Sequence, residues 1–216
     1  SATASFTAEA WERAAPVRDA IDALPLVRGL GDGSLTRDRF DYYMAQDALY
    51  LAEYGRALAG VAALSDEPDE FVFWCDAARE AVVVERALHA AHVDPTAGAD
   101  ASPTCRAYTD FLRARCALGS YGVAVAAVLP CFWIYQDVGA GMIARAGDLG
   151  AHPYGDWIAT YADPGFERST DRVRSIADRL ARAAGDGERE RMHASFATAC
   201  RHEWMFWDAA WRMERS

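Results

Sequence analysis

Apolar residues recur at intervals of three and four along almost the whole chain, and this helical period constrains the fold more than any other feature. No segment shows the sustained alternation of apolar and polar residues that a half-buried β-strand requires. The β-branched run at 82–84 lies inside a long helical pattern, where tertiary context overrides its strand propensity. The sequence therefore predicts an all-helical protein.

Proline and glycine residues mark where the predicted helices begin and end. Pro16 must kink or restart the first amphipathic segment, and the stretch 94–103, with its Pro, Gly and Ser, is the clearest loop. No internal repeat, low-complexity tract or long linker divides the chain, so we expect one domain over 1–216 with seven or eight helices around one core. The predicted helical segments are 5–29, 36–64, 67–92, 103–118, 120–147, 154–161, 167–184 and 187–213.

Composition and charge exclude several classes of protein. The 216 residues are 52% hydrophobic and 25% charged, which is typical of a globular chain. The formal net charge of −10 comes without a basic tract, so we expect no nucleic-acid partner. Five cysteines without a CxxC pair argue against a disulfide framework or structural zinc and favour a reducing cytoplasm. No signal peptide is apparent and no apolar run reaches membrane-spanning length, so we expect no membrane association.

Two carboxylates occupy positions where the helical period demands apolar residues. In segment 36–64, Asp47 stands in the middle of the apolar stripe, with Tyr50 three residues after it on the same side. In segment 187–213, Glu203 lies on a similar stripe. A buried carboxylate is costly unless it is hydrogen-bonded or binds a ligand. Burial also raises its pKa, so Glu203 could act as a proton donor near neutrality.

Cys131 is the most unusual residue of a third stripe, in segment 120–147. It directly follows Pro130, which removes the backbone hydrogen bond to the carbonyl of Ala126 and forces a local kink. Tyr135 stands one turn further on, with its hydroxyl potentially near the sulfur. A lone cysteine on an apolar face is usually inert, and a carboxylate there is usually a salt-bridge partner. Two core carboxylates and a cysteine at a proline kink together favour a polar pocket at the bundle centre.

Four linked motifs resemble the thiaminase II (TenA) family. They appear in the family's order and cover nearly the whole chain, which makes them far more specific together than singly. They read YMAQDALY at 43–50, LPCFWIY at 129–135, YGDWIATY at 154–161 and EWMFW at 203–207. The resemblance implies a haem-oxygenase-like helical bundle, usually a homotetramer, that binds no haem. We expect no metal and no other cofactor.

The resemblance also implies a role for each unusual residue. Cys131 matches the family's nucleophile, and Glu203 matches the acid that protonates a ring nitrogen. Asp47 matches the carboxylate that holds an aminopyrimidine edge, and Tyr108 matches the tyrosine that supports it. The remaining matches are Tyr50 and Phe206, which resemble the aromatic walls on which the ring lies, and Tyr135 and Tyr161, which resemble the tyrosines near the cysteine.

The activity that this resemblance implies is that of an aminopyrimidine aminohydrolase, or thiaminase II, of the cysteine-containing subgroup. Cys131 would add to the protonated pyrimidine ring, the group on the exocyclic methylene would leave, and water would replace it. The product would be hydroxymethylpyrimidine, formed in thiamine salvage. The sequence leaves open whether aminomethylpyrimidine, thiamine or a formylamino analogue is the preferred small-molecule substrate.

Two other functions fit parts of the sequence. A di-iron oxidase on the same fold would use Glu85 and His89, four residues apart, with His92 and a His-Glu pair on the last helix. Such a site needs about six ligands on facing helices, and this chain has five histidines in all. A non-catalytic pyrimidine-binding protein would keep the pocket, but intact Cys131 and Glu203 argue against it. The roles of His89 and His92 stay open.

Overall fold

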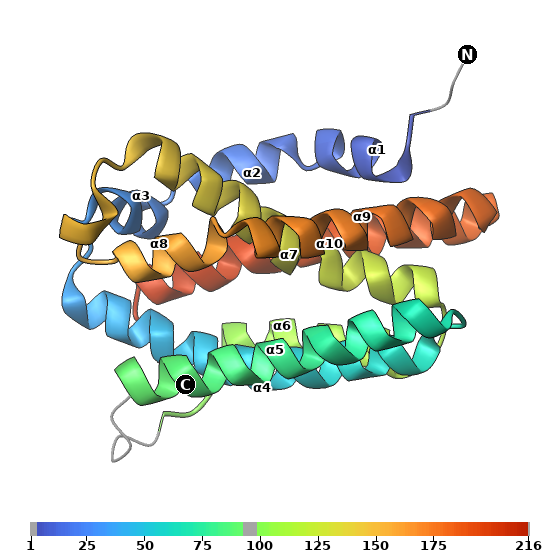
Figure 1. Cartoon of the computed structure of the whole chain (residues 1–216), viewed down its shortest axis with the longest axis horizontal. Helices are drawn as coiled ribbons and strands as arrows, with labels where there is room; N and C mark the ends of the chain where they lie inside the picture. The colour runs from blue at the N-terminus through green and yellow to red at the C-terminus, as the bar shows by residue number, and fades with distance from the viewer. Residues whose placement is uncertain (1–3, 93–98, 216) are drawn as a thin grey trace.

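Helices are the regular elements of this protein in its computed structural model, which describes residues 4–92 and 99–215. No strand occurs in those residues, so the all-helical class is confirmed. Ten α-helices and one 3-10 turn follow one another there (Figure 1). They are α1 Phe6–Arg13, α2 Ala15–Asp22, α3 Pro25–Asp32, α4 Arg37–Leu64, α5 Pro68–His92, α6 Pro103–Ala117, α7 Tyr121–Arg145, η1 Leu149–Ala151, α8 Gly155–Tyr161, α9 Pro164–Ala183 and α10 Asp186–Trp211.

The first predicted segment, 5–29, forms three helices rather than one. Ala14 ends α1 and also caps the start of α2, in which Pro16 lies in the first turn. A proline is tolerated there because its missing N–H would have no helical partner. Pro25 begins α3 after an extended Leu24, since the residue before a proline is driven out of the helical region. Both prolines restart the chain in a new direction, which raises the helix count above the seven or eight expected.

Side-chain caps fix the starts of three later helices, α6, α7 and α9. Ser102, Ser120 and Asp163 each accept a hydrogen bond from a backbone N–H of the helix that follows, as N-caps do. Thr36 precedes α4 in an extended conformation, as expected of an N-cap, but its side chain makes no capping hydrogen bond. Of the predicted loop at 94–103, residues 94–98 lie outside the described part of the chain, and Pro103 already belongs to α6.

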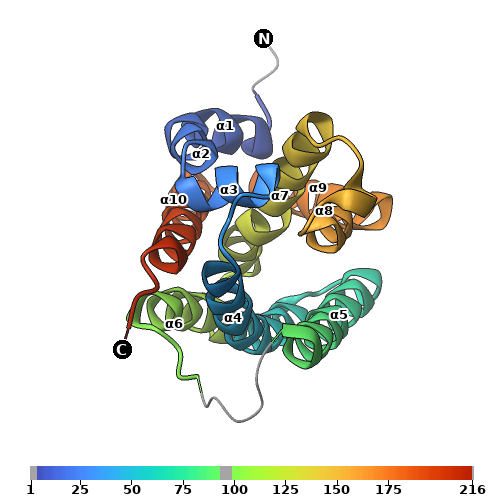
Figure 2. The same ribbon diagram turned by 90° about the vertical axis from the view of Figure 1, so that its left-hand side faces the viewer.

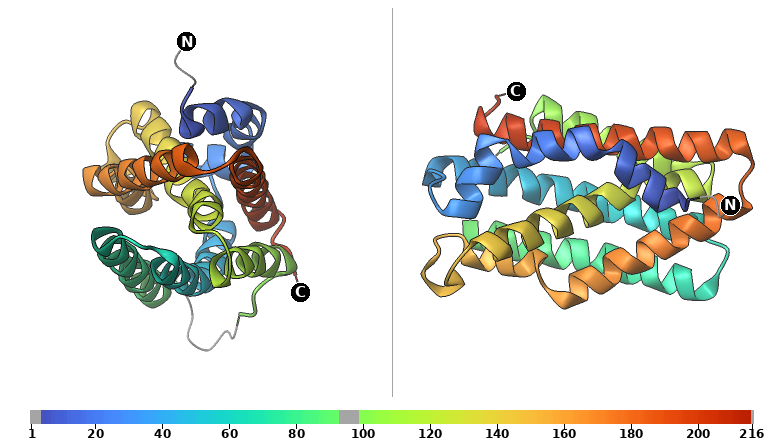
Figure 3. Two further views of the ribbon diagram at one scale, coloured as in Figure 1. Left: turned by 90° about the vertical axis from the view of Figure 1, so that its right-hand side faces the viewer. Right: turned by 90° about the horizontal axis from the view of Figure 1, so that it is seen from above.

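Helix α7 is the central helix of the bundle. Seen end-on, it lies in the middle of the other helices (Figure 2 and Figure 3, left), and it packs along α10, α9 and α8. By length and composition alone α7 could cross a membrane, which we did not expect from its sequence. However, 78% of the window that meets this criterion is buried inside the structure, as in the core helix of a folded domain. This position places Cys131 near the centre of the molecule.

Helix α5 is the least embedded of the long helices. It packs mainly along α4, and only Glu70, Trp74 and Ala81 of its 25 residues are buried. Near its start, the Glu70 carboxylate accepts hydrogen bonds from Arg179 of α9 at 2.6 and 2.8 Å and from the Tyr121 hydroxyl of α7 at 2.7 Å. The indole of Trp74 donates to the same hydroxyl at 2.8 Å. We call Glu70, Trp74, Tyr121 and Arg179 the α5 clasp, because they tie α5 to α7 and α9.

Breaking the clasp is expected to destabilise the fold. Arg179→Met leaves the buried Glu70 carboxylate without its cation, and the expected loss is about 1–3 kcal/mol because water can partly replace the half-exposed guanidinium. Urea unfolding measures the difference. The control is Arg172→Met on an exposed part of α9, which should change stability by less than about 0.5 kcal/mol. Equal unfolding midpoints for the two variants would contradict the structural role of the clasp.

Candidate active site

A cavity of about 850 Å³ opens between α4, α5, α7, α8 and the start of α9. Five of the eight residues singled out in the sequence line it, and they come from three helices. These five are Asp47 and Tyr50 of α4, Cys131 and Tyr135 of α7, and Tyr161 of α8. The other three, Tyr108, Glu203 and Phe206, do not line the cavity and lie directly behind this wall. The structure therefore brings all eight to one region of the bundle, in two layers.

Cys131 lies inside α7, one residue after Pro130, and its side chain is partly exposed to the cavity. The helix continues through the proline. Two residues before Pro130, the carbonyl of Val128 accepts a hydrogen bond from the Tyr54 hydroxyl at 2.8 Å. Tyr54 also lines the cavity, and the sequence analysis did not single it out. Its hydroxyl, which bonds to the backbone just before the proline of α7, is the feature that sequence reasoning missed.

The thiol of Cys131 is protonated in the resting site. Burial raises its pKa well above the usual value, and the carboxylates of Glu203 and Asp47 raise it further. The nearby Tyr50 and Tyr54 hydroxyls act in the opposite direction but do not outweigh burial. A reaction that uses this sulfur as a nucleophile must therefore remove its proton as the new bond forms.

Glu203 is a buried acid held by one hydrogen bond. Its side chain is 1% exposed, and the Tyr108 hydroxyl of α6 donates to its Oε1 atom at 2.5 Å. Burial raises the pKa of Glu203 to about 8, the charge of Asp47 adds to this, and the Tyr108 hydrogen bond opposes it. The group is thus mostly protonated at pH 7, as predicted for a proton donor. The hydrogen bond of Tyr108 is thus with Glu203, whereas the resemblance led us to expect Tyr108 to support Asp47.

Asp47 is a buried carboxylate with an unpaired oxygen. Its side chain is 2% exposed, and its Oδ2 atom has no hydrogen-bond partner in the described residues. Burial alone raises its pKa to about 7. Because buried polar groups in proteins are nearly always hydrogen-bonded, an unpaired carboxylate facing a cavity indicates a ligand-binding position. The hydroxyl of neighbouring Tyr50 is likewise buried without a partner.

Aromatic rings form the walls around these polar groups. Tyr50 packs against Phe206 and Tyr108, with ring centroids 5.5 and 4.9 Å apart. The Tyr135 hydroxyl lies 2.7 Å from that of Tyr43, so its hydrogen bond is with this second tyrosine and not with the Cys131 sulfur. Burial holds the pKa values of these phenols well above 10, so they stay neutral hydrogen-bonding groups.

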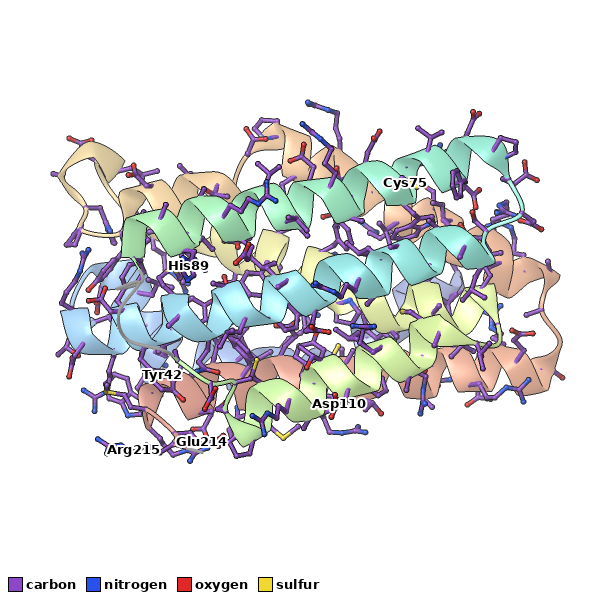
Figure 4. All side chains as sticks on the ribbon, turned by 90° about the horizontal axis from the view of Figure 1, so that it is seen from below. Tyr42, Cys75, His89, Asp110, Glu214 and Arg215 are labelled. Atoms are coloured by element: carbon purple, nitrogen blue, oxygen red, sulfur yellow. The ribbon has the colours of Figure 1, made fainter. Side chains whose placement is uncertain are left out.

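A di-iron centre finds no set of ligands in the described ranges, 4–92 and 99–215. No three side chains of His, Cys, Asp or Glu gather there closely enough to hold a metal ion. His89 is exposed on α5 (Figure 4), and the cavity lining contains no histidine. Within the part of the chain that the structure describes, the metal-binding alternative therefore lacks the converging ligands that such a site requires.

The chain matches the family model described as TENA/THI-4/PQQC over residues 11–213. It is 39% identical over 213 residues to a thiamine biosynthesis multifunctional protein ThiED of Corynebacterium efficiens, covering 96% of this chain and 28% of that protein. It is 32% identical over 217 residues to an aminopyrimidine aminohydrolase of Halalkalibacterium halodurans, covering 96% of each. The chain thus spans less than a third of the first relative and nearly all of the second.

Two solved structures share the fold. A TenA homologue from P. horikoshii OT3 superposes with a TM-score of 0.85 at 25% identity, over 97% of this chain and 99% of that one. A protein from Shewanella denitrificans, described as a domain of unknown function with a heme oxygenase-like fold, gives a TM-score of 0.74 at 16% identity, over 96% and 92% of the two chains. The haem-oxygenase-like architecture expected from the sequence is confirmed.

Proposed function

This chain belongs to the TENA/THI-4/PQQC family, and from that membership we propose that it is a hydrolase of aminopyrimidines, acting in thiamine salvage. The observation that carries this proposal is the buried, unpaired Asp47 carboxylate in the same cavity as Cys131. The aminopyrimidine aminohydrolase of comparable length supports the reaction type. The substrate we propose is aminomethylpyrimidine, with thiamine as the second. We further propose a homotetramer, as the sequence resemblance implies, in the reducing cytoplasm that the cysteine content favours.

We assign recognition of the pyrimidine ring to Asp47. A 4-aminopyrimidine presents an amine donor beside a ring-nitrogen acceptor, and a carboxyl group can pair with both at once. With a pKa of about 7, Asp47 is available in either protonation state near neutrality. The aromatic faces of Tyr50 and the rings behind it supply a flat wall for the pyrimidine. Binding would give Asp47 the partner that it lacks.

Catalysis begins with Glu203, whose raised pKa keeps a proton available. Protonation of a ring nitrogen makes the pyrimidine electrophilic, and the sulfur of Cys131 adds to a ring carbon as the thiol loses its proton. The C–N bond on the exocyclic methylene then breaks, and the amine takes up a proton and departs as ammonia. Water adds to the methylene, and expulsion of the sulfur restores the ring as hydroxymethylpyrimidine. Glu203 lies behind the cavity wall, where it is hydrogen-bonded to Tyr108, whose ring packs against Tyr50 of the wall.

The activity is expected to fall as the pH rises through about 8. Above this pH Glu203 loses the proton that it must donate, and kcat/KM reports the ionisation of the free enzyme. Glu203→Gln should lower kcat by about 100-fold or more and remove this alkaline limb. Rates measured from pH 5 to 10 for both proteins provide the test. Glu190→Gln, an exposed change on the same helix, serves as control, and an identical profile for Glu203→Gln would contradict the assignment.

The proposed function is tested by incubating the purified protein with aminomethylpyrimidine and, separately, with thiamine. We expect hydroxymethylpyrimidine from at least the first, with one ammonia released per pyrimidine. Chromatography and an ammonia assay measure the two products. Binding of the pyrimidine without any product would overturn the enzyme proposal and identify a non-catalytic pyrimidine-binding protein.

A further inference from the structure

Three buried side chains from three helices form a hydrogen-bonded chain that ends at the cavity. The indole N–H of Trp207 on α10 donates to the Tyr43 hydroxyl of α4 at 3.2 Å, and this hydroxyl lies 2.7 Å from that of Tyr135 on α7. Trp207 and Tyr43 are 0% exposed and do not line the cavity, whereas Tyr135 does. We call Trp207, Tyr43 and Tyr135, in that order, the donor chain.

The direction of the protons along the donor chain follows from burial. An indole N–H can only donate, so the Tyr43 oxygen is the acceptor of that bond. The bond between the two tyrosines could have either oxygen as its donor. If Tyr135 donated, the proton of Tyr43 would be buried without an acceptor, because Tyr43 forms no other side-chain hydrogen bond within the described residues. A buried donor without an acceptor is costly, so Tyr43 donates to Tyr135.

The hydroxyl proton of Tyr135 is then available to the cavity. Tyr135 lines the cavity, and in the part of the chain that the structure describes its hydroxyl bonds only to Tyr43. Cys131 stands four residues earlier on α7, so the two side chains are neighbours on one face of the helix, about 5–6 Å apart at their Cβ atoms. A pyrimidine ring with its methylene group is of similar size. When the Cys131 sulfur adds to the ring, the group on the exocyclic methylene would therefore lie beside the Tyr135 hydroxyl.

The proposed reaction needs a proton at this place. An amine departs from a methylene carbon only when its nitrogen takes up a proton as the C–N bond breaks. The burial that keeps Cys131 and Glu203 uncharged also disfavours an ammonium ion, so the substrate does not readily bring this proton with it. We propose that Tyr135 supplies the proton to the leaving amine, and that Tyr43 is a positioning residue which, with Trp207, orients the Tyr135 hydroxyl toward it. This proposal rests on the proposed function, since it names the acid of the bond-breaking step.

The protons balance over the two halves of the reaction. As the C–N bond breaks, its electron pair goes to the nitrogen, which takes the Tyr135 proton and leaves as ammonia. The phenolate oxygen of Tyr135 keeps the hydrogen bond from Tyr43 during this step. Water then gives its hydroxide to the methylene carbon and its remaining proton to the Tyr135 oxygen. Tyr135 thus acts first as an acid and then as a base, and it is returned unchanged.

A substrate whose leaving group needs no proton separates this role from a structural one. In thiamine, the leaving nitrogen belongs to a positively charged thiazolium ring. This nitrogen takes the electron pair of the broken C–N bond, and the ring departs uncharged without a proton donor. The amine of aminomethylpyrimidine cannot leave in this way. Loss of the donor chain should therefore slow the reaction of aminomethylpyrimidine and leave that of thiamine almost unchanged.

The variants Tyr43→Phe and Tyr135→Phe and their combination test this inference. For aminomethylpyrimidine we expect kcat to fall about tenfold in Tyr43→Phe and about 100-fold in Tyr135→Phe, with KM changed by less than about threefold. The double variant should be no slower than Tyr135→Phe, because Tyr43 acts only through Tyr135. For thiamine, kcat should stay within about threefold of wild type in all three variants, which also shows that they are folded.

The matched control is Tyr154→Phe. It removes another buried tyrosine hydroxyl, one that donates to the carbonyl of Leu35 at 2.5 Å and does not line the cavity. Both rates should stay within about twofold of wild type. Equal slowing of the two substrates in Tyr43→Phe would leave Tyr43 with a packing role and overturn the inference. An unchanged kcat for aminomethylpyrimidine in Tyr43→Phe, or a double variant about tenfold slower than Tyr135→Phe, would overturn it as well.

A wild-type protein that binds pyrimidines but forms no product would instead overturn the proposed function. The orientation of the Tyr135 hydroxyl would then be measured by binding. Hydroxymethylpyrimidine offers an oxygen acceptor at the exocyclic position, whereas the analogue with a methyl group there offers none. We expect Tyr43→Phe to bind the first compound about fivefold more weakly than wild type does, and the second equally well. Dissociation constants that are the same in variant and wild type for both compounds would contradict the donor chain.

Discussion

Cys131→Ser is expected to lower kcat for aminomethylpyrimidine by at least about a thousandfold. A serine hydroxyl in the same buried position is harder to deprotonate than the thiol and is a weaker nucleophile. The covalent addition to the pyrimidine ring is therefore lost. KM should change by less than about threefold, because Asp47 and the aromatic wall hold the ring. Steady-state rates with both substrates measure the effect, and circular dichroism shows whether the variant keeps its helical fold.

The matched control is Cys75→Ser. Cys75 is a free cysteine on the exposed side of α5 (Figure 4), outside the cavity, so its replacement should leave kcat within about twofold of wild type. A Cys131→Ser protein that turns over aminomethylpyrimidine at the wild-type rate would contradict the assignment of the sulfur as nucleophile. Loss of activity in both cysteine variants would assign the effect to unfolding or aggregation, which the circular dichroism spectrum would confirm.

Asp47→Asn is expected to stabilise the fold at alkaline pH while it weakens substrate binding. Burial raises the pKa of Asp47 from 3.8 to about 7, so the folded state favours the protonated form. The contribution of this protonated form to the free energy of unfolding is fully present below about pH 4, and it is lost as the pH rises through 7. Three pKa units correspond to about 4 kcal/mol at most, and asparagine cannot ionise. The variant should therefore gain about 2–4 kcal/mol over wild type at pH 8, and much less at pH 5.

Urea unfolding of both proteins at pH 5 and pH 8 measures this difference. Asp110→Asn, an exposed change on α6 (Figure 4), should show no such pH dependence. Asp47→Asn should also bind hydroxymethylpyrimidine about tenfold more weakly, because an amide can pair with the neutral ring but, unlike the carboxylate, cannot form an ion pair with its protonated form. A stability difference that stays constant between the two pH values would contradict a buried, unpaired carboxylate at position 47.

The helical period identified the candidate site because it predicts which side chains share one face of a helix. Asp47 and Glu203 were visible as carboxylates on apolar stripes, and both are buried. Cys131 stood out because it follows Pro130, and its side chain does line the cavity. Each of these inferences needed only the geometry of one helix, which local sequence determines.

Contacts between helices could not be predicted in this way. Tyr108 bonds to Glu203, and Tyr135 bonds to Tyr43, because of how α6, α10, α4 and α7 are placed relative to one another. Periodicity shows neither that placement nor the rotamers that complete it. For the same reason the sequence could not show that Glu203 lies behind the cavity wall and not on it. The cavity is lined by segments that are distant in the chain, from α4 to the start of α9, so no single motif revealed it.

Hydrolysis at this cavity is tested most directly by a single-turnover reaction of the wild-type protein with aminomethylpyrimidine in water enriched in oxygen-18. We expect one ammonia for each hydroxymethylpyrimidine formed, and mass spectrometry should find the heavy isotope in the new hydroxyl group. Protein that binds the aminopyrimidine but forms no hydroxymethylpyrimidine, or forms it without the isotope, would contradict a hydrolytic reaction at Cys131.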